Sequence, residues 1–557
     1  MVENINQLFA ELVLRAFNYK MTFQISLGSS VVSKKLLKSG MIVSAMTLIS
    51  RVLGLVRDVV VANLLGAGAS ADLFFFANKI PNFLRRLFAE GAFAQAFVPV
   101  LTEYEKTKSS GEVKQLIAAV SGTLGTIVTV ITIIGVLGSG VLTALFGFGW
   151  FLEWYHGGAE AYKFELASNM LKITFPYLWF ITFTALSGAI LNTLGKFAIA
   201  AFTPVFLNIA IIGCALFVSP QLAQPEFGLA IGVFLGGAIQ FFFQLPFMAK
   251  EGMLVKPKWD WYHPGVVKIR TLMIPALFGV SVSQINLLLD TFIASFLQTG
   301  SISWLYYSDR LLEFPLGLFG IAIATVILPS LSSSHVSKSE DHFAKTIDWG
   351  IRMVCMLGFP AMLGLIVLAE PMLRVLFMRG EFGVDDVSMA SMSLFAYGSG
   401  LLSFMMVKIL APGYYSRQDT KTPVKFGIIA MVSNMVLNII FAIPFGYVGL
   451  AIATSLSATL NAGLLWRGLY KCGVYQKQAE TVSVLLRIGV SGLVMAVVML
   501  YLNPTLQQWA EFNLFDSATR LFALIAVGIS TYFVCAGLIG LRIRHFKISA
   551  EKRKNES

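Results

Sequence analysis

Long apolar stretches alternate with short polar breaks from about residue 40 to the end of the chain. The apolar runs are continuous, as in residues 198–218 and 485–502, and do not alternate with a period of two, so they indicate membrane-spanning helices rather than barrel strands. A spanning helix needs about 20 mostly apolar residues. We expect 14 such helices, over residues 40–64, 72–102, 114–147, 162–192, 198–218, 227–248, 267–297, 303–332, 346–376, 387–412, 423–443, 447–467, 482–502 and 518–541. The predicted fold class is an all-α polytopic membrane protein.

Composition and charge agree with this prediction. Of 557 residues, 56% are hydrophobic and only 13% are charged, and the net charge is +12. The basic residues gather in alternate loops, for example at Lys34 to Lys38 and at Lys250 to Arg270, whereas loops such as 64–71 and 298–303 carry none. This asymmetry follows the positive-inside rule, so we expect an inner-membrane protein with both termini in the cytoplasm and no nucleic-acid partner.

An internal repeat organises the predicted helices. Aligning Asp58 with Asp290 places Leu73-Phe74-Phe75 opposite Leu305-Tyr306-Tyr307, so the first two spans resemble the seventh and eighth. Each copy is displaced from the other by six helices, an even number, so we expect two six-helix lobes related by a pseudo-twofold axis along the membrane normal. The expected divisions are an N-terminal extension that is disordered or a misassigned start (1–34), an N-lobe (35–248), a C-lobe (249–475), two further helices (476–545) and a basic cytoplasmic tail (546–557). Prolines, among them Pro81, Pro99, Pro315 and Pro360, are expected to interrupt the helices around a central cavity.

Charged side chains stand inside the first two spans. The first contains Ser50-Arg51 and Arg57-Asp58, and a charge at the centre of a membrane costs about 2.5 to 3.5 kcal/mol even on insertion scales. Arg51 and Asp58 are seven residues apart and share a helix face, whereas Arg57 is expected to point elsewhere unless the helix deforms near Gly54. An internal salt bridge from either arginine to Asp58 is an open alternative to a ligand site. The second span contributes four polar residues, Asn82, Arg85, Arg86 and Glu90.

The eighth span adds Asp309, Arg310 and Glu313, which either balance one another in a packing network or contribute to a site. Guanidinium groups fork onto phosphate oxygens through paired hydrogen bonds. We therefore expect a pyrophosphate or similar polyanion to bind where the arginines of the two repeat-related helix pairs converge. Lys408 either adds a further positive charge or extends its side chain to the membrane surface.

A second polar group contains Asp290, Asn434, Asn438 and Thr454, all within apolar runs. Oxygen ligands of this kind suit a small cation, but Asn and Thr also join membrane helices by hydrogen bonds, and both interpretations remain open. No phosphate-loop, metal-protease, nucleophile-elbow or dinucleotide motif is present, so we expect a transporter rather than an enzyme.

Several motifs are similar to those of a known family. They are Ser50-Arg51-Val52-Leu53-Gly54, the run from Lys79 to Phe93, Asp309 to Pro315, and Ala411 to Asp419 with Lys421-Thr422-Pro423. The chain resembles the MurJ (MviN) family of lipid II flippases, of the superfamily (MOP) that also contains the MATE drug exporters, over residues from about 35 to 545.

This resemblance implies transport of lipid II, the undecaprenyl-pyrophosphate-linked disaccharide pentapeptide, to the outer leaflet for peptidoglycan synthesis, cell-wall biogenesis and cell shape. It assigns the headgroup to a substrate-binding set and gating or cavity roles to a second set. The substrate-binding set is Arg51, Arg57, Arg85, Arg86, Arg310 and Asn82; the gating and cavity set is Ser50, Asp58, Asp72, Glu90, Asp309, Glu313 and Lys408. The helices of residues 476–545 would hold the prenyl tail.

The same resemblance implies a sodium site on Asp290, Asn434, Asn438, Leu450 and Thr454, but Asn438 replaces a carboxylate, so the membrane potential is the rival source of energy. We expect no other cofactor, and we expect a monomer that works beside cell-wall synthesis proteins. The alternatives are a cation-coupled MATE-like exporter, a flippase of another polyprenyl-pyrophosphate-linked glycan, and a membrane enzyme acting on polyprenyl phosphates.

Overall fold

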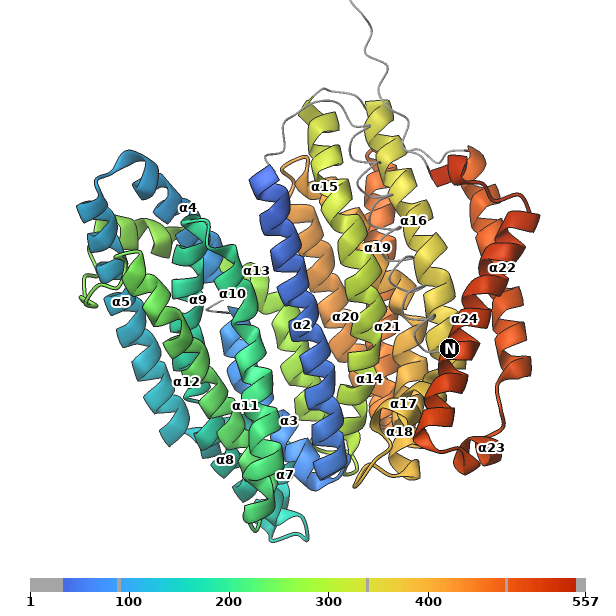
Figure 1. Cartoon of the computed structure of the whole chain (residues 1–557), viewed down its shortest axis with the longest axis horizontal. Coiled ribbons are helices and arrows are strands. Elements are labelled where there is room, and N and C mark those ends of the chain that lie inside the picture. Colours follow the sequence, from blue (N-terminus) through green and yellow to red (C-terminus); the bar gives the residue numbers. More distant parts are fainter. Residues whose placement is uncertain (1–33, 88–91, 337–339, 476–478, 547–557) are drawn as a thin grey trace, which may run out of the picture.

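A computed structural model describes residues 34–87, 92–336, 340–475 and 479–546, and every regular element within them is a helix (Figure 1). The N-terminal half contains α2 (Lys34–Leu65), α3 (Ala69–Arg85), α4 (Ala92–Thr107), α5 (Ser110–Leu137), α6 (Ser139–Phe146), α7 (Phe148–His156), α8 (Ala161–Thr174), α9 (Tyr177–Thr193), α10 (Phe197–Phe202), α11 (Pro204–Phe217), η2 (Ser219–Gln221) and α12 (Glu226–Lys250). The C-terminal half contains α13 (Pro264–Ala294), α14 (Ser301–Pro315), η3 (Leu316–Gly320), α15 (Ile321–Val336), α16 (Glu340–Val367), α17 (Ala369–Phe377), α18 (Val384–Ser399), α19 (Leu401–Tyr415), α20 (Lys421–Phe445) and α21 (Tyr447–Lys471). The chain continues through α22 (Ala479–Leu502), α23 (Leu506–Glu511), α24 (Leu514–Leu538) and η4 (Ile543–Phe546).

Eleven helices among the described residues are long and apolar enough to cross a membrane. They coincide with eleven of the expected spans, and the remaining three fall on α2, on α3 with α4, and on α13. The all-α polytopic membrane fold is therefore confirmed, while the count of 14 spans stays a prediction.

Helices continue through three of the prolines singled out in the sequence, and one helix ends at a fourth. Pro81, Pro99 and Pro360 lie inside α3, α4 and α16, so the prediction of breaks at these three was wrong. Pro315 ends α14, and the π-helical turn η3 follows it directly. Neighbouring helices can satisfy the backbone groups that a proline frees, which explains why a proline alone does not end a membrane helix.

Two groups of helices stand side by side in Figure 1, with α2 between them in this view. In the N-terminal half, α2 packs on α10 and α11, and α12 packs on α9 and α11. In the C-terminal half, α21 packs on α18, α19 and α20. Helix α13 contacts both groups, because it packs on α4 and on α20, and Lys268 Nζ lies 2.5 Å from Glu103 Oε2.

Besides the contacts of α13, loops of the two halves touch at one end of the bundle, which we call the Gly66 end; the opposite end, where α2 begins, is the Lys34 end. At the Gly66 end, the Glu381 amide donates to the Asn63 carbonyl over 3.1 Å, and Tyr307 Oη donates to the Gly66 carbonyl over 3.4 Å. Gly66 has a φ of +61°, and a Cβ there would lie 2.5 Å from the Glu381 carbonyl oxygen, so this close approach requires glycine.

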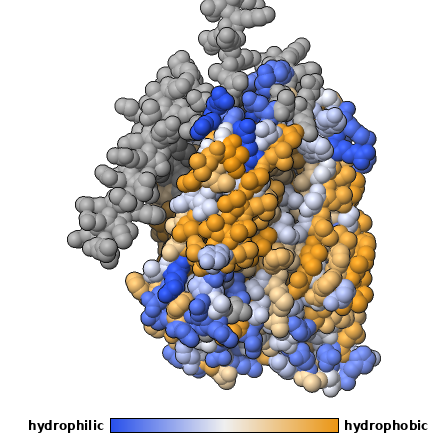
Figure 2. Space-filling view, turned by 90° about the vertical axis from the view of Figure 1, so that its right-hand side faces the viewer, coloured by the Kyte–Doolittle hydropathy of each residue, from blue (hydrophilic) through white to orange (hydrophobic). Residues whose placement is uncertain are grey.

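The last two long helices present an apolar face. Helices α22 and α24 pack on each other, α22 packs on α16, and α24 packs on α17. Leu486, Val497, Phe522 and Leu538 are at least 65% exposed. Figure 2 shows this side of the molecule as an apolar band between hydrophilic ends, which is the pattern of a surface that faces lipid.

Candidate functional site

Asp58 is the centre of a charged network between α2 and α14. Its Oδ1 accepts hydrogen bonds from Arg57 Nη2 over 2.6 Å and from Tyr306 Oη over 3.0 Å, and its Oδ2 accepts from Arg310 Nε over 2.5 Å. Arg57 Nη2 also donates to Tyr306 Oη over 3.1 Å. One buried carboxylate therefore holds two arginines, one from each half of the molecule.

A third helix joins this network through an amide side chain. Arg57 Nη1 donates to Asn208 Oδ1 over 3.2 Å, and Asn208 Nδ2 donates to the Ser50 carbonyl over 3.1 Å. The long arginine stem lets Arg57 turn back to its neighbour Asp58, so the expectation that Arg57 points elsewhere was wrong. The Asp58 carboxylate is only 1% exposed, and such a buried charge is stable only when it is paired.

Arg51 lies seven residues before Asp58 on α2 and is exposed. Its guanidinium lies next to Gly317 in η3. Among the described residues, the ion pairs of Asp58 are with Arg57 and Arg310 and not with Arg51. The open salt-bridge alternative is thus realised for Arg57, while Arg51 stays available on the same side of α2.

The polar residues of α3 form a second group. Arg85 Nε donates to Asn82 Oδ1 over 3.1 Å, and Arg86 Nη1 donates to Gln284 Oε1 of α13 over 3.4 Å. Lys79 of α3 interacts electrostatically with Asp290, Asp309 and Arg86. Glu90, the remaining expected member, lies outside the described residues.

Helix α14 links the two groups, because Asp309 belongs to the second and its neighbour Arg310 to the first. Arg310 Nη1 also lies 3.1 Å from Glu313 Oε2, so the acids and the base of α14 partly balance one another. Lys408 lies on α19 with an exposed side chain.

Asp72 holds the two halves together at the Gly66 end. Its Oδ2 accepts from the Gly300 amide over 2.7 Å, and its Oδ1 accepts from the amide and the hydroxyl of Ser303 over 2.8 and 2.7 Å. The carboxylate of α3 thus caps the N-terminus of α14, where unpaired amides and the helix dipole favour a negative charge.

A buried lysine makes another contact between the halves at this end. Lys163 of α8 is 1% exposed, forms an ion pair with Glu160, and donates to Thr299 Oγ over 2.6 Å. Thr299 Oγ donates in turn to Glu160 over 3.2 Å. These three side chains form a closed ring that ties the α7–α8 connection to the α13–α14 connection.

The group expected to bind a cation forms a chain of side-chain hydrogen bonds. Asn438 Nδ2 donates to Asp290 Oδ1 over 2.7 Å and to Asn434 Oδ1 over 3.1 Å, and Asn434 Nδ2 donates to Thr454 Oγ over 3.4 Å. Thr454 Oγ donates to the Leu450 carbonyl over 2.9 Å. All five expected residues are therefore brought together, with the amide group of Asn438 turned to the only carboxylate of the set.

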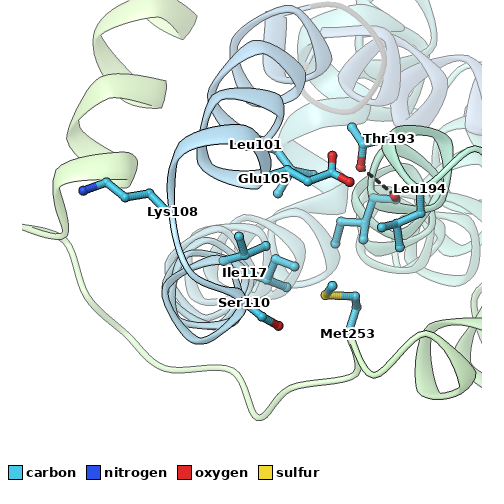
Figure 3. A pocket seen from close by; sticks show the side chains of 10 residues that line it. Leu101, Glu105, Lys108, Ser110, Ile117, Thr193, Leu194 and Met253 are labelled. Atoms are coloured by element: carbon cyan, nitrogen blue, oxygen red, sulfur yellow. Dashed lines mark hydrogen bonds between the residues drawn. The ribbon is translucent and has the colours of Figure 1, made fainter.

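Two cavities lie away from the charged residues of α2, α3 and α14. The first cavity, of about 160 Å³, is lined by residues of α4, α5 and α9 and by Met253 (Figure 3). At the edge of this cavity, Thr193 Oγ donates to the Ile190 carbonyl over 2.7 Å. The second, of about 450 Å³, lies between α17, α18 and the α22–α23 connection and includes Glu370 and Trp509.

Comparison with known proteins identifies the family. A family model described as "Lipid II flippase MurJ" matches residues 61–518. The chain belongs to this family. It is 69% identical to the "Probable lipid II flippase MurJ" of Vibrio cholerae over 93% of this chain and 99% of that protein, and 37% identical to the "Lipid II flippase MurJ" of Burkholderia cenocepacia over 91% and 98%.

Solved structures agree with this membership. The structure of "Lipid II flippase MurJ, inward closed conformation" matches with a TM-score of 0.75 and 29% identity over 91% of this chain and 99% of that one. An inward-facing multidrug resistance MATE transporter matches with a TM-score of 0.63 over 78% and 98%, and its 14% identity supports the shared fold only. The resemblance found in the sequence and the assignment as a transporter rather than an enzyme are confirmed.

Several members of the two polar groups were missed in the sequence. Asn208 is an amide in an otherwise apolar run, a signal that was available, and Lys79 stands in one of the family-like motifs. Tyr306 was used only to align the repeat. Its role depends on the pairing of α14 with α2, which the sequence of either helix alone does not reveal.

Proposed function

We propose that the chain moves lipid II from the cytoplasmic to the periplasmic leaflet of the inner membrane by alternating access. The observation that carries this proposal is the sharing of Asp58 by Arg57 and Arg310, which places two guanidiniums from opposite halves in one network. With Arg51, Lys79, Arg85 and Arg86, the described cluster has six cations against the carboxylates of Asp58, Asp290, Asp309 and Glu313. A surplus of guanidiniums suits the pyrophosphate of such a lipid and disfavours an exporter of cationic drugs.

The charge pattern supports an orientation with the Lys34 end in the cytoplasm. Lysines such as Lys106, Lys108 and Lys250 stand near this end, where Lys196 Nζ lies 3.0 Å from Glu251 Oε1. Loops at the Gly66 end, such as residues 64–71 and 298–303, carry no lysine or arginine. By the positive-inside rule, the Gly66 end then faces the periplasm.

The contacts between the halves support alternation. Asp72 with Gly300 and Ser303, and Lys163 with Thr299, close the Gly66 end. Headgroup access is then from the cytoplasmic side, and release requires these contacts to break while the halves rock about the charged network. The apolar face of α22 and α24 suits the prenyl tail. Because one chain supplies both halves, we propose a monomer as the working unit.

The energy source is proposed to be the membrane potential rather than sodium. Sodium needs oxygen ligands, but the Asn438 amide group donates to Asp290 and Asn434, and Asp290 is the only carboxylate of the set. Asn438 Oδ1 is buried without a hydrogen-bond partner among the described residues, so one oxygen is left over, which is too few to replace the missing carboxylate. A potential supplies about 2.3 kcal/mol per charge per 100 mV.

Complementation tests the proposal. The chain is expressed in cells depleted of their own lipid II flippase, and lipid II reaching the outer leaflet is measured. Restored access is expected, together with loss of access for Arg310→Ala at normal membrane levels. Failure of the wild-type chain at normal membrane levels would contradict the proposed function.

A further inference from the structure

We propose that Gly317 is the positioning residue for Arg51. Because Gly317 has no side chain, it leaves a space between α2 and η3 that the Arg51 guanidinium occupies, and we call this space the Gly317 seat. A Cβ built at Gly317 would lie 2.5 Å from Arg51 Nη1 and 3.3 Å from both Cζ and Nη2. Cβ contacts under 3.0 Å essentially never occur, and the guanidinium is the end of a flexible side chain, so a Cβ at residue 317 would displace the guanidinium from this place. The inference rests on the proposed function, in which Arg51 contacts the lipid headgroup.

The seat lies on a line of side-chain contacts between α2 and the α14–η3 segment, which run antiparallel. Seven residues separate Arg51 from Asp58 on α2, and seven separate Arg310 from Gly317 on the other side. Asp58 pairs with Arg310, and Arg51 meets Gly317, so the two contacts are two turns apart on the same pair of faces. Between them, a Cβ at Gly54 would lie 3.6 Å from Arg310 Nη2, which continues the same line of contact.

Arg51 differs from the two arginines that hold Asp58. Arg57 and Arg310 each form an ion pair with Asp58, whereas Arg51 is exposed and has no carboxylate partner among the described residues. Two helical turns place it about 10 Å along α2 from Asp58. At Gly317, the Arg51 guanidinium is therefore not paired with a carboxylate and lies closer to the Lys34 end than Asp58 does. A phosphate that enters from the Lys34 end would contact Arg51 before it reaches the Asp58 network.

The backbone at the seat is irregular, which supports a functional role. η3 is a single π-helical turn from Leu316 to Gly320 that follows Pro315. Single π-helical turns are frequent at functional sites. The same turn contains Gly320, where a Cβ would lie 3.3 Å from Leu316 Cδ1, 3.5 Å from Met405 Cγ and 3.9 Å from Met405 Cα. Gly320→Ala is thus a matched control that adds the same methyl group without touching Arg51.

The first measurement needs no lipid II. The full chain is reconstituted in nanodiscs and treated with phenylglyoxal, which modifies exposed guanidiniums, and modification of Arg51 is followed by mass spectrometry. We expect Gly317→Ala to change the rate at Arg51 at least threefold, and Gly320→Ala to leave it at the wild-type value. An unchanged rate in Gly317→Ala would overturn the positioning role, whatever the protein transports.

The second measurement is lipid II binding to the same nanodiscs. Loss of a hydrogen-bonded charge weakens binding by about tenfold or more. We expect this loss for Arg51→Ala, a loss of similar size for Gly317→Ala, and no further loss in the double variant. Losses that multiply in the double variant, or wild-type binding by either single variant, would overturn the inference. If the wild-type chain itself fails to bind lipid II, the proposed function fails, and the phenylglyoxal rates still decide whether Gly317 positions Arg51.

Discussion

Asp58 of α2 and Arg310 of α14 form an ion pair with 2.5 Å between Oδ2 and Nε, and this pair joins the first half of the molecule to the second. Helix α2 packs closely on α10 and α11, and it reaches α14 through these long side chains. An arginine that leaves Asp58 for a phosphate would therefore weaken the link between the halves as it binds the cargo. In the proposed mechanism, this arrangement would couple cargo binding to movement of the halves.

Asp58→Asn is expected to lower transport at least tenfold at normal membrane levels. The substitution keeps the shape of the side chain but leaves Arg57 and Arg310 without their shared negative charge, and breaking a buried ion pair costs about 3 to 5 kcal/mol. Lipid II translocation and the amount of protein in the membrane are measured together. Asp341→Asn is the control, because Asp341 is 74% exposed in its pair with Lys345 and such pairs contribute little. Equal transport by both variants would remove Asp58 from the mechanism.

Asp72→Asn is expected to open the Gly66 end. An amide offers one acceptor oxygen where the carboxylate offers two, so at least one of the bonds to Gly300 and Ser303 is lost. Spin labels at the exposed Tyr155 of α7 and Val384 of α18 report the separation of the halves, in a background without the native cysteines. The population at longer distance should rise several-fold.

The control for this experiment is Asp386→Asn at the same end. Asp386 accepts hydrogen bonds from the Gly383 amide and from Trp304 Nε1, both within the C-terminal half. The Asp386→Asn variant should therefore give the wild-type distribution of distances between the two spin labels. If Asp72→Asn also gave the wild-type distribution, the bonds of Asp72 to the N-terminus of α14 would not hold the halves together.

Asp348→Asn is expected to lower the free energy of unfolding by about 3 kcal/mol. The Asp348 carboxylate is buried and paired, and breaking such a pair is costly. Asp348 accepts from Tyr475 Oη over 2.9 Å and from Thr481 Oγ over 2.6 Å, and its Oδ2 lies 2.7 Å from Arg352 Nη2. These bonds fasten the start of α22 to α16. Unfolding in detergent is measured against Asp341→Asn on the same helix, and equal melting temperatures would show that the cluster contributes no stability.

Asn438→Asp is expected to create a sodium site that the wild-type chain lacks. A second carboxylate beside Asp290 would replace the amide donor by an oxygen ligand. Sodium should raise the melting temperature of the variant and not of the wild-type chain, because a ligand that binds only the folded state stabilises it. Wild-type transport should be the same in sodium-free medium, and a clear loss there would restore sodium as the coupling ion.

The spans were predictable because hydropathy over about 20 residues decides whether a segment enters the membrane. The breaks between helices within one apolar segment were not predictable. Pro176 precedes α9 and Gly400 separates α18 from α19, yet neither residue changes the apolar character of the segment in which it lies. Whether a proline interrupts a helix depends on neighbours that the sequence does not place, as Pro81 shows.

Most charged residues of the candidate site could be singled out from the sequence, and their role in binding stays a prediction. Their partners could not be foreseen. Helical spacing correctly put Arg51 and Asp58 on one face, but a seven-residue spacing carries no information about a second helix. Arg310 and Gly317 meet those positions only because α14 runs antiparallel to α2. The bonds of Asp72 to Gly300 and Ser303 likewise depend on how the two halves meet.

The most direct test of the central claim is translocation of lipid II by the purified chain in liposomes. Lipid II is incorporated, and the fraction that becomes accessible to an enzyme outside the vesicle is followed with time at an imposed membrane potential. The account predicts accessibility well above that of protein-free liposomes, abolished in Arg310→Ala and retained in Asp341→Asn. Accessibility equal to that of protein-free liposomes, or undiminished in Arg310→Ala, would contradict it.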